Sequence, residues 1–220
     1  MKHSAVIIGA SGLVGGHLIR LLLQNEQFTE IRSFGRTNLP ITHSKLIQYE
    51  VDFEYFDNQA NKCNGDVFYC CIGTTIRKAG SQDAFRKIDF EIPLTFAKIA
   101  EKKNAQTIVV VSSLGANAKS SNFYLRTKGE MENAIEATSI PKKVFVQPSL
   151  LLGKRPEFRF SEKMGEIVLR SIGYFFFGRM KKYKAIKAET VAIAMINSTL
   201  DPQYKGKIES DSLVKMAKCN

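Results

Sequence analysis

The sequence predicts an α/β fold built on a doubly wound parallel sheet. Short apolar runs recur along the chain, and most are continuous rather than alternating, as in strands buried on both faces. Segments with apolar residues at helical spacing lie between these runs. Strands that alternate with helices are typical of parallel sheets covered on both faces. The expected strands are Ala5–Ile8, Ile31–Phe34, Lys45–Val51, Asp66–Ile72, Thr107–Ser112 and Lys143–Gln147.

A glycine-rich turn follows the first strand and runs into the first helix, where Val14 and Leu18 begin an apolar stripe. Its spacing is G-x-x-G-x-x-G. In dinucleotide-binding folds of the Rossmann type, such glycines permit a tight turn, a close approach to pyrophosphate and close helix–strand packing. An ordinary strand–helix turn is the weaker alternative. The residues expected at the cofactor are Gly9, Ser11, Gly12, Leu13, Val14 and Gly15.

The ends of the second and third strands bear on the choice of cofactor. An NAD site usually has Asp or Glu at the end of the second strand, but this chain reads Ser33-Phe-Gly-Arg36. A guanidinium suits a 2′-phosphate, so Arg36 favours NADP(H), the alternative being an exposed loop arginine. After the third strand, Asp52 is placed to accept from the adenine amino group and Phe53 to pack nearby. A plain loop acid is an equal alternative for Asp52.

A tyrosine and a lysine follow the fifth strand. That strand ends in Ser112 and Ser113, and Tyr124 and Lys128 come next. In a helix, residues four positions apart share one face. The spacing alone is common on helix surfaces, but its position after the fifth strand and the serine pair indicates a catalytic site.

At these residues the sequence resembles the short-chain dehydrogenase/reductase superfamily over nearly its whole length. The glycine turn, the serine pair and Y-x-x-x-K occur in the same order. Further segments resemble the atypical branch that contains the Tat-interacting-protein-like oxidoreductases and bacterial, sugar-nucleotide-epimerase-like relatives. These segments are Cys71–Thr75, Lys78–Gly80, Phe85–Asp89, Ser120–Tyr124, Lys128–Glu132 and Pro148–Gly153.

The resemblance implies a role for each matching residue. Tyr124 would transfer a proton as general acid or base, and Lys128 would bind the nicotinamide ribose and stabilise the phenolate. Ser113, or as second choice Ser112, would hydrogen-bond the substrate carbonyl or hydroxyl. The resemblance also places further residues at the cofactor: Gly73, Thr74, Thr75, Leu151 and Arg159.

The pattern changes after Pro148, where one more helix is expected over Glu189–Leu200. We expect a single domain, with residues 1–148 as the nucleotide-binding core and 149–220 as substrate-side elements at the carboxyl end of the sheet. So short a segment indicates a small or shallow substrate site. Sugar-nucleotide epimerase or dehydratase activity is therefore the weaker alternative.

The formal net charge of +11 leaves the partners open. It fits an anionic ligand, nucleic acid or membrane surface, and equally a soluble surface. Because no RNA-binding signature accompanies the basic run near the last helix, we disfavour nucleic acid and interpret the run as a solvated face or an attractor of anionic ligands. This run consists of Arg179, Lys181, Lys182, Lys184 and Lys187.

The remaining features exclude several classes of protein. Within the sequence, no apolar stretch approaches the ~20 residues that span a bilayer, and no secretion signal is recognisable. The neighbouring Cys70 and Cys71 read as buried thiols, and neither the cysteines nor the three histidines match a metal motif. We expect a cytoplasmic, metal-free protein with a small-molecule substrate. A homodimer or a protein partner stays open.

Together these features predict an NADP(H)-dependent oxidoreductase, with NAD as the second choice of cofactor. Hydride would move between the nicotinamide and a substrate carbon while Tyr124 handles the proton. The alternative is an NADP(H)-binding sensor or regulatory protein without turnover. The intact pair of Tyr124 and Lys128 argues against a pure sensor, which needs no proton donor.

Overall fold

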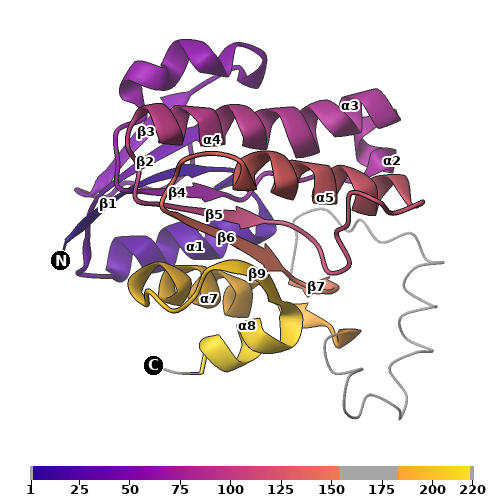
Figure 1. The fold of residues 1–220 in the computed structure, drawn as a ribbon. Helices are drawn as coiled ribbons and strands as arrows, with labels where there is room; N and C mark the ends of the chain where they lie inside the picture. The colour runs from indigo at the N-terminus through magenta and orange to yellow at the C-terminus, as the bar shows by residue number, and fades with distance from the viewer. Residues whose placement is uncertain (1, 154–182, 219–220) are drawn as a thin grey trace.

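A seven-stranded, fully parallel sheet forms the centre of the protein (Figure 1). The computed structural model describes residues 2–153 and 183–218. The strand order is β3-β2-β1-β4-β5-β6-β9, which confirms the predicted fold class and the six predicted strands. The strands are β1 (His3–Ile8), β2 (Phe28–Gly35), β3 (Leu46–Glu50), β4 (Val67–Cys70), β5 (Thr107–Val111), β6 (Lys142–Gln147) and β9 (Gly206–Glu209).

Helices cover both faces of the sheet (Figure 1). On one face lie α1 (Leu13–Gln24), α7 (Ala188–Leu200) and α8 (Ser210–Met216), and on the other α4 (Ile92–Lys102) and α5 (Phe123–Glu136). The expected C-terminal helix is thus α7, and it packs directly on α1. None of the described helices is long and apolar enough to cross a membrane.

Short helical segments complete the connections. They include η1 (Phe53–Lys62) after β3, then α2 (Ile76–Ala79), α3 (Gln82–Arg86) and the π-helical turn η2 (Lys87–Glu91) between β4 and α4. Because η2 runs straight from α3 into α4, one helical rod extends from Gln82 to Lys102.

The apolar side chains of the strands pack in two separate hydrophobic cores, one on each face of the sheet. In β1, Ala5 and Ile7 pack in the cluster shared with α1 and α7, whereas Val6 and Ile8 pack in the cluster shared with α4. All four side chains are fully buried. Burial on both faces explains why the run is continuously apolar instead of alternating.

The strand order reverses between β1 and β4. Their ends lie side by side, since Ile8 pairs with Cys70. At such a reversal the connections diverge to opposite faces of the sheet and leave a crevice at the carboxyl ends of the strands, where open α/β folds bind ligands. A two-stranded ribbon, β7 (Leu151–Leu152) and β8 (Ile186–Lys187), follows β6.

Candidate functional site

The glycine turn lies at the reversal of the strand order. Gly9 has φ +80°, and a Cβ atom there would lie 2.6 Å from the backbone carbon of Cys71. A Cβ on Gly15 would lie 2.2 Å from the carbonyl oxygen of Gly9. Neither position accepts a larger residue without movement of the backbone. The spacing therefore reflects close packing of β1, β4 and α1.

The N-terminus of α1 is left without a side-chain cap because Gly12 is the N-cap residue. The first N–H groups of a helix have no partner inside the helix, and together with the helix dipole they favour an anion. Ser11 is exposed and Leu13 half-buried, while the Val14 side chain is buried in the core. Val14 therefore offers a ligand only its backbone.

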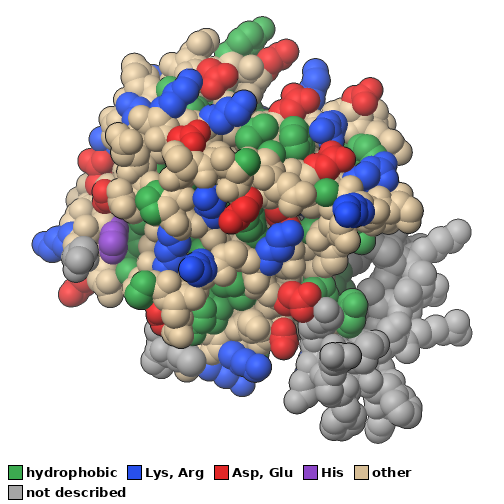
Figure 2. Space-filling view, viewed as in Figure 1, with side chains coloured by type: hydrophobic (Ala, Val, Ile, Leu, Met, Phe, Trp, Pro, Cys, Tyr) green, Lys and Arg blue, Asp and Glu red, His purple; other side chains and the backbone are tan. Residues whose placement is uncertain are grey.

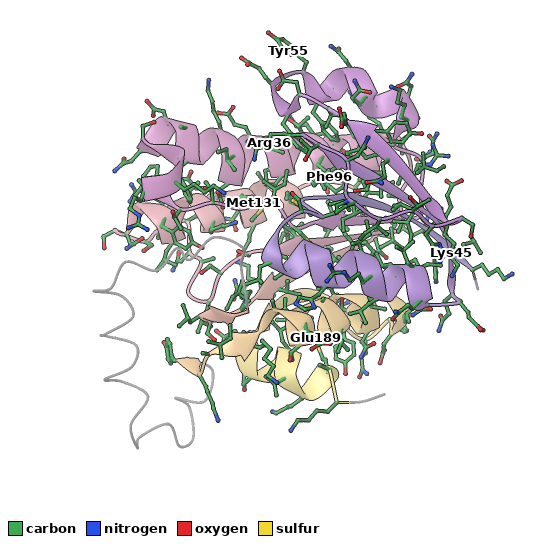
Figure 3. The ribbon with its side chains drawn as sticks, turned by 180° about the vertical axis from the view of Figure 1, so that it is seen from behind. Arg36, Lys45, Tyr55, Phe96, Met131 and Glu189 are labelled. Atoms are coloured by element: carbon green, nitrogen blue, oxygen red, sulfur yellow. The ribbon has the colours of Figure 1, made fainter. Side chains whose placement is uncertain are left out.

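Arg36 lies just beyond the end of β2 and is exposed (Figure 3). Because Phe34 pairs with Ile8, Arg36 sits at the same edge of the sheet as Gly9. The structure adds a residue that the sequence argument missed, since Glu50 at the end of β3 pairs with Gly35. One Glu50 carboxylate oxygen accepts a hydrogen bond of 3.1 Å from the Asn38 N–H. The strand end thus carries a carboxylate as well as a guanidinium.

Asp52 and Phe53 begin the segment after β3. The exposed Asp52 side chain accepts from the Glu54 N–H at 3.0 Å and so caps η1. The Phe53 ring packs on Phe56, with ring centroids 5.3 Å apart. Local capping and packing account for both residues, so their predicted contact with adenine has no separate structural signal.

The loop after β4 contains the three residues expected beneath the nicotinamide end of a cofactor. Thr74 donates its N–H to Oδ2 of Asp89 at 2.9 Å. The Thr75 hydroxyl accepts from the Lys78 N–H at 3.2 Å and caps α2. Gly73 is exposed, and a Cβ atom placed on it would lie 3.7 Å from Nζ of Lys128. This loop therefore brings the β4 end next to the predicted catalytic lysine.

Lys128 is buried, with 4% of its side chain exposed. Its Nζ lies 2.7 Å from Oδ1 of Asp89 and donates to the Val111 carbonyl oxygen at 3.4 Å. Burial lowers the pKa of this ammonium, but the facing Asp89 carboxylate and, to a smaller extent, Tyr124 raise it, so that the net shift is upward. Lys128 is therefore held in its charged form.

Tyr124 lies in the first turn of α5, whose N-cap Asn122 accepts from the Leu125 N–H. The phenol ring is half-buried and packs on Phe85, with centroids 5.4 Å apart. The phenol contributes to the upward shift of the Lys128 pKa, as expected for side chains on one helix face. The structure thus brings Tyr124, Lys128 and Gly73 to one end of the sheet.

The two serines after β5 have different surroundings. The buried Ser112 hydroxyl donates to Oε1 of Glu132, which also accepts from Gln147 at 2.8 Å. The second Glu132 oxygen pairs with Lys207 of β9 at 2.8 Å. Ser112 is thus part of a buried network joining four elements, whereas Ser113 is half-buried. The geometry favours Ser113 for contact with a ligand.

Two cysteines flank the crevice from β4. Cys70 is fully buried, and burial raises the pKa of its thiol to about 12. Burial also raises the pKa of Cys71 well above its usual value. Both thiols are therefore protonated at neutral pH. The prediction of a buried thiol is confirmed for Cys70, whereas the Cys71 residue is only partly buried.

Other predicted residues lie toward the C-terminus. Leu151 packs against the core cluster that contains Ala10 and Val14. Arg159, and Arg179, Lys181 and Lys182 of the basic run, lie outside the described residues. In Figure 2 the basic and acidic side chains are interspersed on the visible face. Within the described ranges, no group of His, Cys, Asp and Glu is arranged to hold a metal ion.

Comparison with known proteins finds full-length relatives, although no family profile matches the chain. The mitochondrial protein FMP52 of Debaryomyces hansenii is 32% identical over 209 residues, which cover 92% of this chain and 90% of that protein. Protein HTATIP2 of Rattus norvegicus is 34% identical over 209 residues, covering 91% and 83%. The chain belongs to the FMP52/HTATIP2 family. This agrees with the branch that the sequence motifs resemble.

Solved structures show the fold that the FMP52/HTATIP2 family member shares with more distant proteins. MoeE5, solved with UDP-glucose and NAD, superposes with a TM-score of 0.69 at 13% identity, covering 97% of this chain and 80% of MoeE5. A UDP-N-acetylglucosamine 4-epimerase from Methanobrevibacter ruminantium gives a TM-score of 0.69 at 15% identity, covering 98% and 81%. At such identities the likeness concerns the fold.

The expectation of a cytoplasmic protein is wrong on this comparison. The FMP52 relatives from Debaryomyces hansenii, Candida albicans and Candida glabrata are all named as mitochondrial proteins. These relatives point to a mitochondrial rather than a cytoplasmic location. A sequence without a recognisable secretion signal or membrane-spanning stretch does not have to be cytoplasmic, which is why the prediction was wrong.

Proposed function

We propose that this member of the FMP52/HTATIP2 family is an oxidoreductase that uses a nicotinamide dinucleotide. The observation that carries the proposal is the position of Lys128, whose buried ammonium lies next to Gly73 in the loop after β4. That loop leaves the sheet beside the glycine turn of Gly9. The glycine turn and a charged lysine with a neighbouring tyrosine therefore lie at the same edge of the sheet, where the strand order reverses.

The residues of the turn fit a dinucleotide. At Gly9 and Gly15, Cβ atoms would collide with backbone, so the turn has the tight bend and the close helix–strand packing that the dinucleotide-binding fingerprint requires. The uncapped α1 terminus after Gly12 would donate backbone N–H groups to the phosphates. When bound, the nicotinamide ring supplies or accepts a hydride.

We propose NADP(H) as the preferred cofactor because the exposed Arg36 guanidinium lies at the strand end where a 2′-phosphate would sit. Glu50 provides a competing possibility, since a carboxylate at this edge suits a free ribose hydroxyl. One of its two carboxylate oxygens accepts the Asn38 N–H, and the binding of both nucleotides to variants at Arg36 and Glu50 tests which group is used.

The chain's own residues would carry the proton. Tyr124 would donate its phenolic proton to a substrate carbonyl oxygen during reduction and accept it back during oxidation. The Lys128 ammonium would stabilise the phenolate through its positive charge and hydrogen-bond a ribose hydroxyl. Ser113 would orient the substrate oxygen, because the Ser112 hydroxyl is committed to Glu132.

A small carbonyl or alcohol substrate fits the fold better than a sugar nucleotide. Most described residues after β6 belong to β9, α7 and α8, and these elements extend the sheet and cover its face. They contribute to the main core instead of building a separate substrate unit. Epimerase activity on sugar nucleotides is accordingly the weaker candidate.

The test begins with cofactor binding and proceeds to turnover. NADPH and NADH titrations followed by nicotinamide fluorescence are expected to show tighter NADPH binding. A panel of small aldehydes and ketones is then screened for NADPH oxidation, with Tyr124→Phe as the inactive control. Binding without oxidation of any compound would favour the sensor, and failure to bind either nucleotide would refute the proposal.

A further inference from the structure

One buried carboxylate connects the loop after β4 to the predicted catalytic lysine. Asp89 is fully buried, its Oδ1 lies 2.7 Å from Nζ of Lys128, and its Oδ2 accepts the Thr74 N–H at 2.9 Å. Both carboxylate oxygens therefore have a partner: the Lys128 ammonium contacts one, and the backbone N–H of Thr74 donates to the other. The position of Asp89 was not expected from helical periodicity.

Asp89 belongs to the π-helical turn η2, in the middle of the rod formed by α3 and α4. A π turn inserts an extra residue into a helix, and such turns are frequent at functional sites. Its neighbour across the rod, α5, carries Lys128. The irregular turn thus occurs at the point where the rod meets the lysine.

The ionisation of the Lys128 ammonium depends on the ionisable groups around it. The groups that raise the pKa of the ammonium are Asp89 of η2, Tyr124 of α5 itself and Cys70 of β4. Cys70 carries no charge at neutral pH because burial raises the pKa of its thiol to about 12. Asp89 is then the principal counter-charge for an ammonium that burial alone would push toward its neutral form.

The other charged groups on the packed elements are engaged elsewhere. On α5, Glu130 pairs with Arg86, and Glu132 pairs with Lys207. On α4, Glu101 accepts from the Ser139 N–H, and on β6 the Lys143 ammonium donates to backbone carbonyls of the loop that ends at Ile140. None of these groups is among the causes of the shift in the Lys128 pKa.

We propose that Asp89 is a positioning residue that keeps Lys128 charged and holds its ammonium beside Gly73, while fixing the loop through the Thr74 N–H. This inference rests on the proposed function only for the catalytic purpose of the charged lysine. It concerns the ionisation of Lys128, which exists whether or not the protein turns over a substrate. Asp89 itself would not touch the reacting atoms, because it is fully buried behind Lys128 and Thr74.

The test compares Asp89→Asn with Glu130→Gln. The asparagine keeps an oxygen for the Thr74 N–H but removes the charge opposite Lys128. Glu130→Gln removes a carboxylate from the ion pair between α5 and α3 without touching Lys128. A purely structural role for Asp89 predicts similar behaviour of the two variants.

The primary readout is the ionisation of Lys128 itself. Lysines carrying ¹³C at Cε are titrated by NMR, with the Lys128 signal assigned by its loss in Lys128→Arg. In the wild type the signal is expected to stay at its protonated position beyond pH 10, whereas in Asp89→Asn its midpoint falls by more than about one pH unit, as for other buried lysines without a counter-charge. Glu130→Gln is expected to match the wild type.

Two results would overturn the proposal. One is an unchanged Lys128 midpoint in folded Asp89→Asn. The other needs no variant at Asp89, namely a wild-type Lys128 that titrates below the surface lysines, and it applies even if Asp89→Asn does not fold. Absence of NADPH binding by the wild type would refute the proposed function instead, and it would leave the NMR result standing.

Discussion

Gly15 packs so closely beneath Gly9 that a Cβ atom on Gly15 would lie 2.2 Å from the Gly9 carbonyl oxygen. The same carbonyl accepts the Gly12 N–H at 3.0 Å. The turn can adopt this shape only because Gly15 has no side chain. A methyl group at position 15 must therefore displace the turn itself.

The first prediction concerns this packing. Gly15→Ala is expected to lower the free energy of unfolding by about 1–3 kcal/mol, as for other overpacked sites, and to abolish measurable NADPH binding. Urea denaturation and nicotinamide fluorescence measure the two effects. Gly16→Ala is the matched control, because a Cβ there would lie 3.6 Å from its nearest neighbour, an ordinary contact. Normal NADPH binding by Gly15→Ala would contradict the assigned turn.

A second prediction separates the two cofactors at the end of β2. Arg36→Ala is expected to weaken NADPH binding by about 10- to 100-fold, since a charge-assisted hydrogen bond contributes about 1.5–3 kcal/mol, and to leave NADH binding nearly unchanged. Titrations with both nucleotides check this. Glu50→Gln is the companion variant, and any loss that it causes is expected in NADH binding and not in NADPH binding. Equal losses for both nucleotides would remove Arg36 from recognition of a 2′-phosphate.

The third prediction tests the proton donor. Tyr124→Phe keeps the ring that packs on Phe85 but loses the hydroxyl. Turnover of any substrate found is expected to fall by about 10²- to 10⁴-fold, the usual range for general acid–base catalysis, with cofactor affinity retained. Steady-state kinetics and fluorescence titration measure the two quantities. Unchanged turnover would show that Tyr124 does not transfer the proton.

The two serines give a fourth prediction with opposite outcomes. Ser112→Ala removes a donor from the buried Glu132 carboxylate and should lower the free energy of unfolding by about 1–3 kcal/mol, the cost of leaving a buried polar group unsatisfied. Ser113→Ala should leave stability nearly unchanged and reduce turnover. Thermal unfolding and kinetics on both variants decide which serine serves which purpose. The reverse pattern would assign the substrate contact to Ser112.

A fifth prediction concerns stability at alkaline pH. Because the pKa of Lys128 is raised in the folded protein, its ion pair stabilises the fold at neutral pH and up to the ordinary lysine value of about 10.4. This contribution is lost as the pH rises through the folded-state pKa. Lys128→Met is expected to cost about 3–5 kcal/mol at pH 7, since it leaves the buried Asp89 charge unpaired.

The corresponding measurement is urea denaturation of wild type and Lys128→Met between pH 7 and pH 11. The difference between them should be constant below about pH 10 and shrink above it. Addition of Asp89→Asn to Lys128→Met should restore much of the lost stability, because both charges are then absent. A difference that does not vary with pH would exclude the ion pair as its source.

Much of the fold was predictable because the strands are buried on both faces. Continuous apolar runs such as Ala5–Ile8 have few alternative interpretations, and strands were correctly predicted there. The edge strand β9 was not predicted because it is short and polar, and of its residues only Ile208 is buried. Its pairing with β6 depends on contacts far along the chain, which local patterns do not contain.

The candidate site was predictable where it depended on local spacing and hidden where it depended on the sheet. Tyr124 and Lys128 share a helix, so four-residue spacing sufficed. Glu50 reaches the β2 end only because β3 pairs beside it in register. Asp89 reaches Lys128 through a π-helical turn, which departs from the ordinary helical period and has no simple sequence signature.

The raised thiol pKa values of Cys70 and Cys71 have a consequence for the resistance of these residues to oxidation. Oxidants attack thiolates rather than thiols, and both cysteines remain thiols far into the alkaline range. The two sulfur atoms beside the proposed cofactor site are thereby protected from oxidation. The protein should tolerate mild peroxide without modification of Cys70 or Cys71, and mass spectrometry of the peroxide-treated protein checks this.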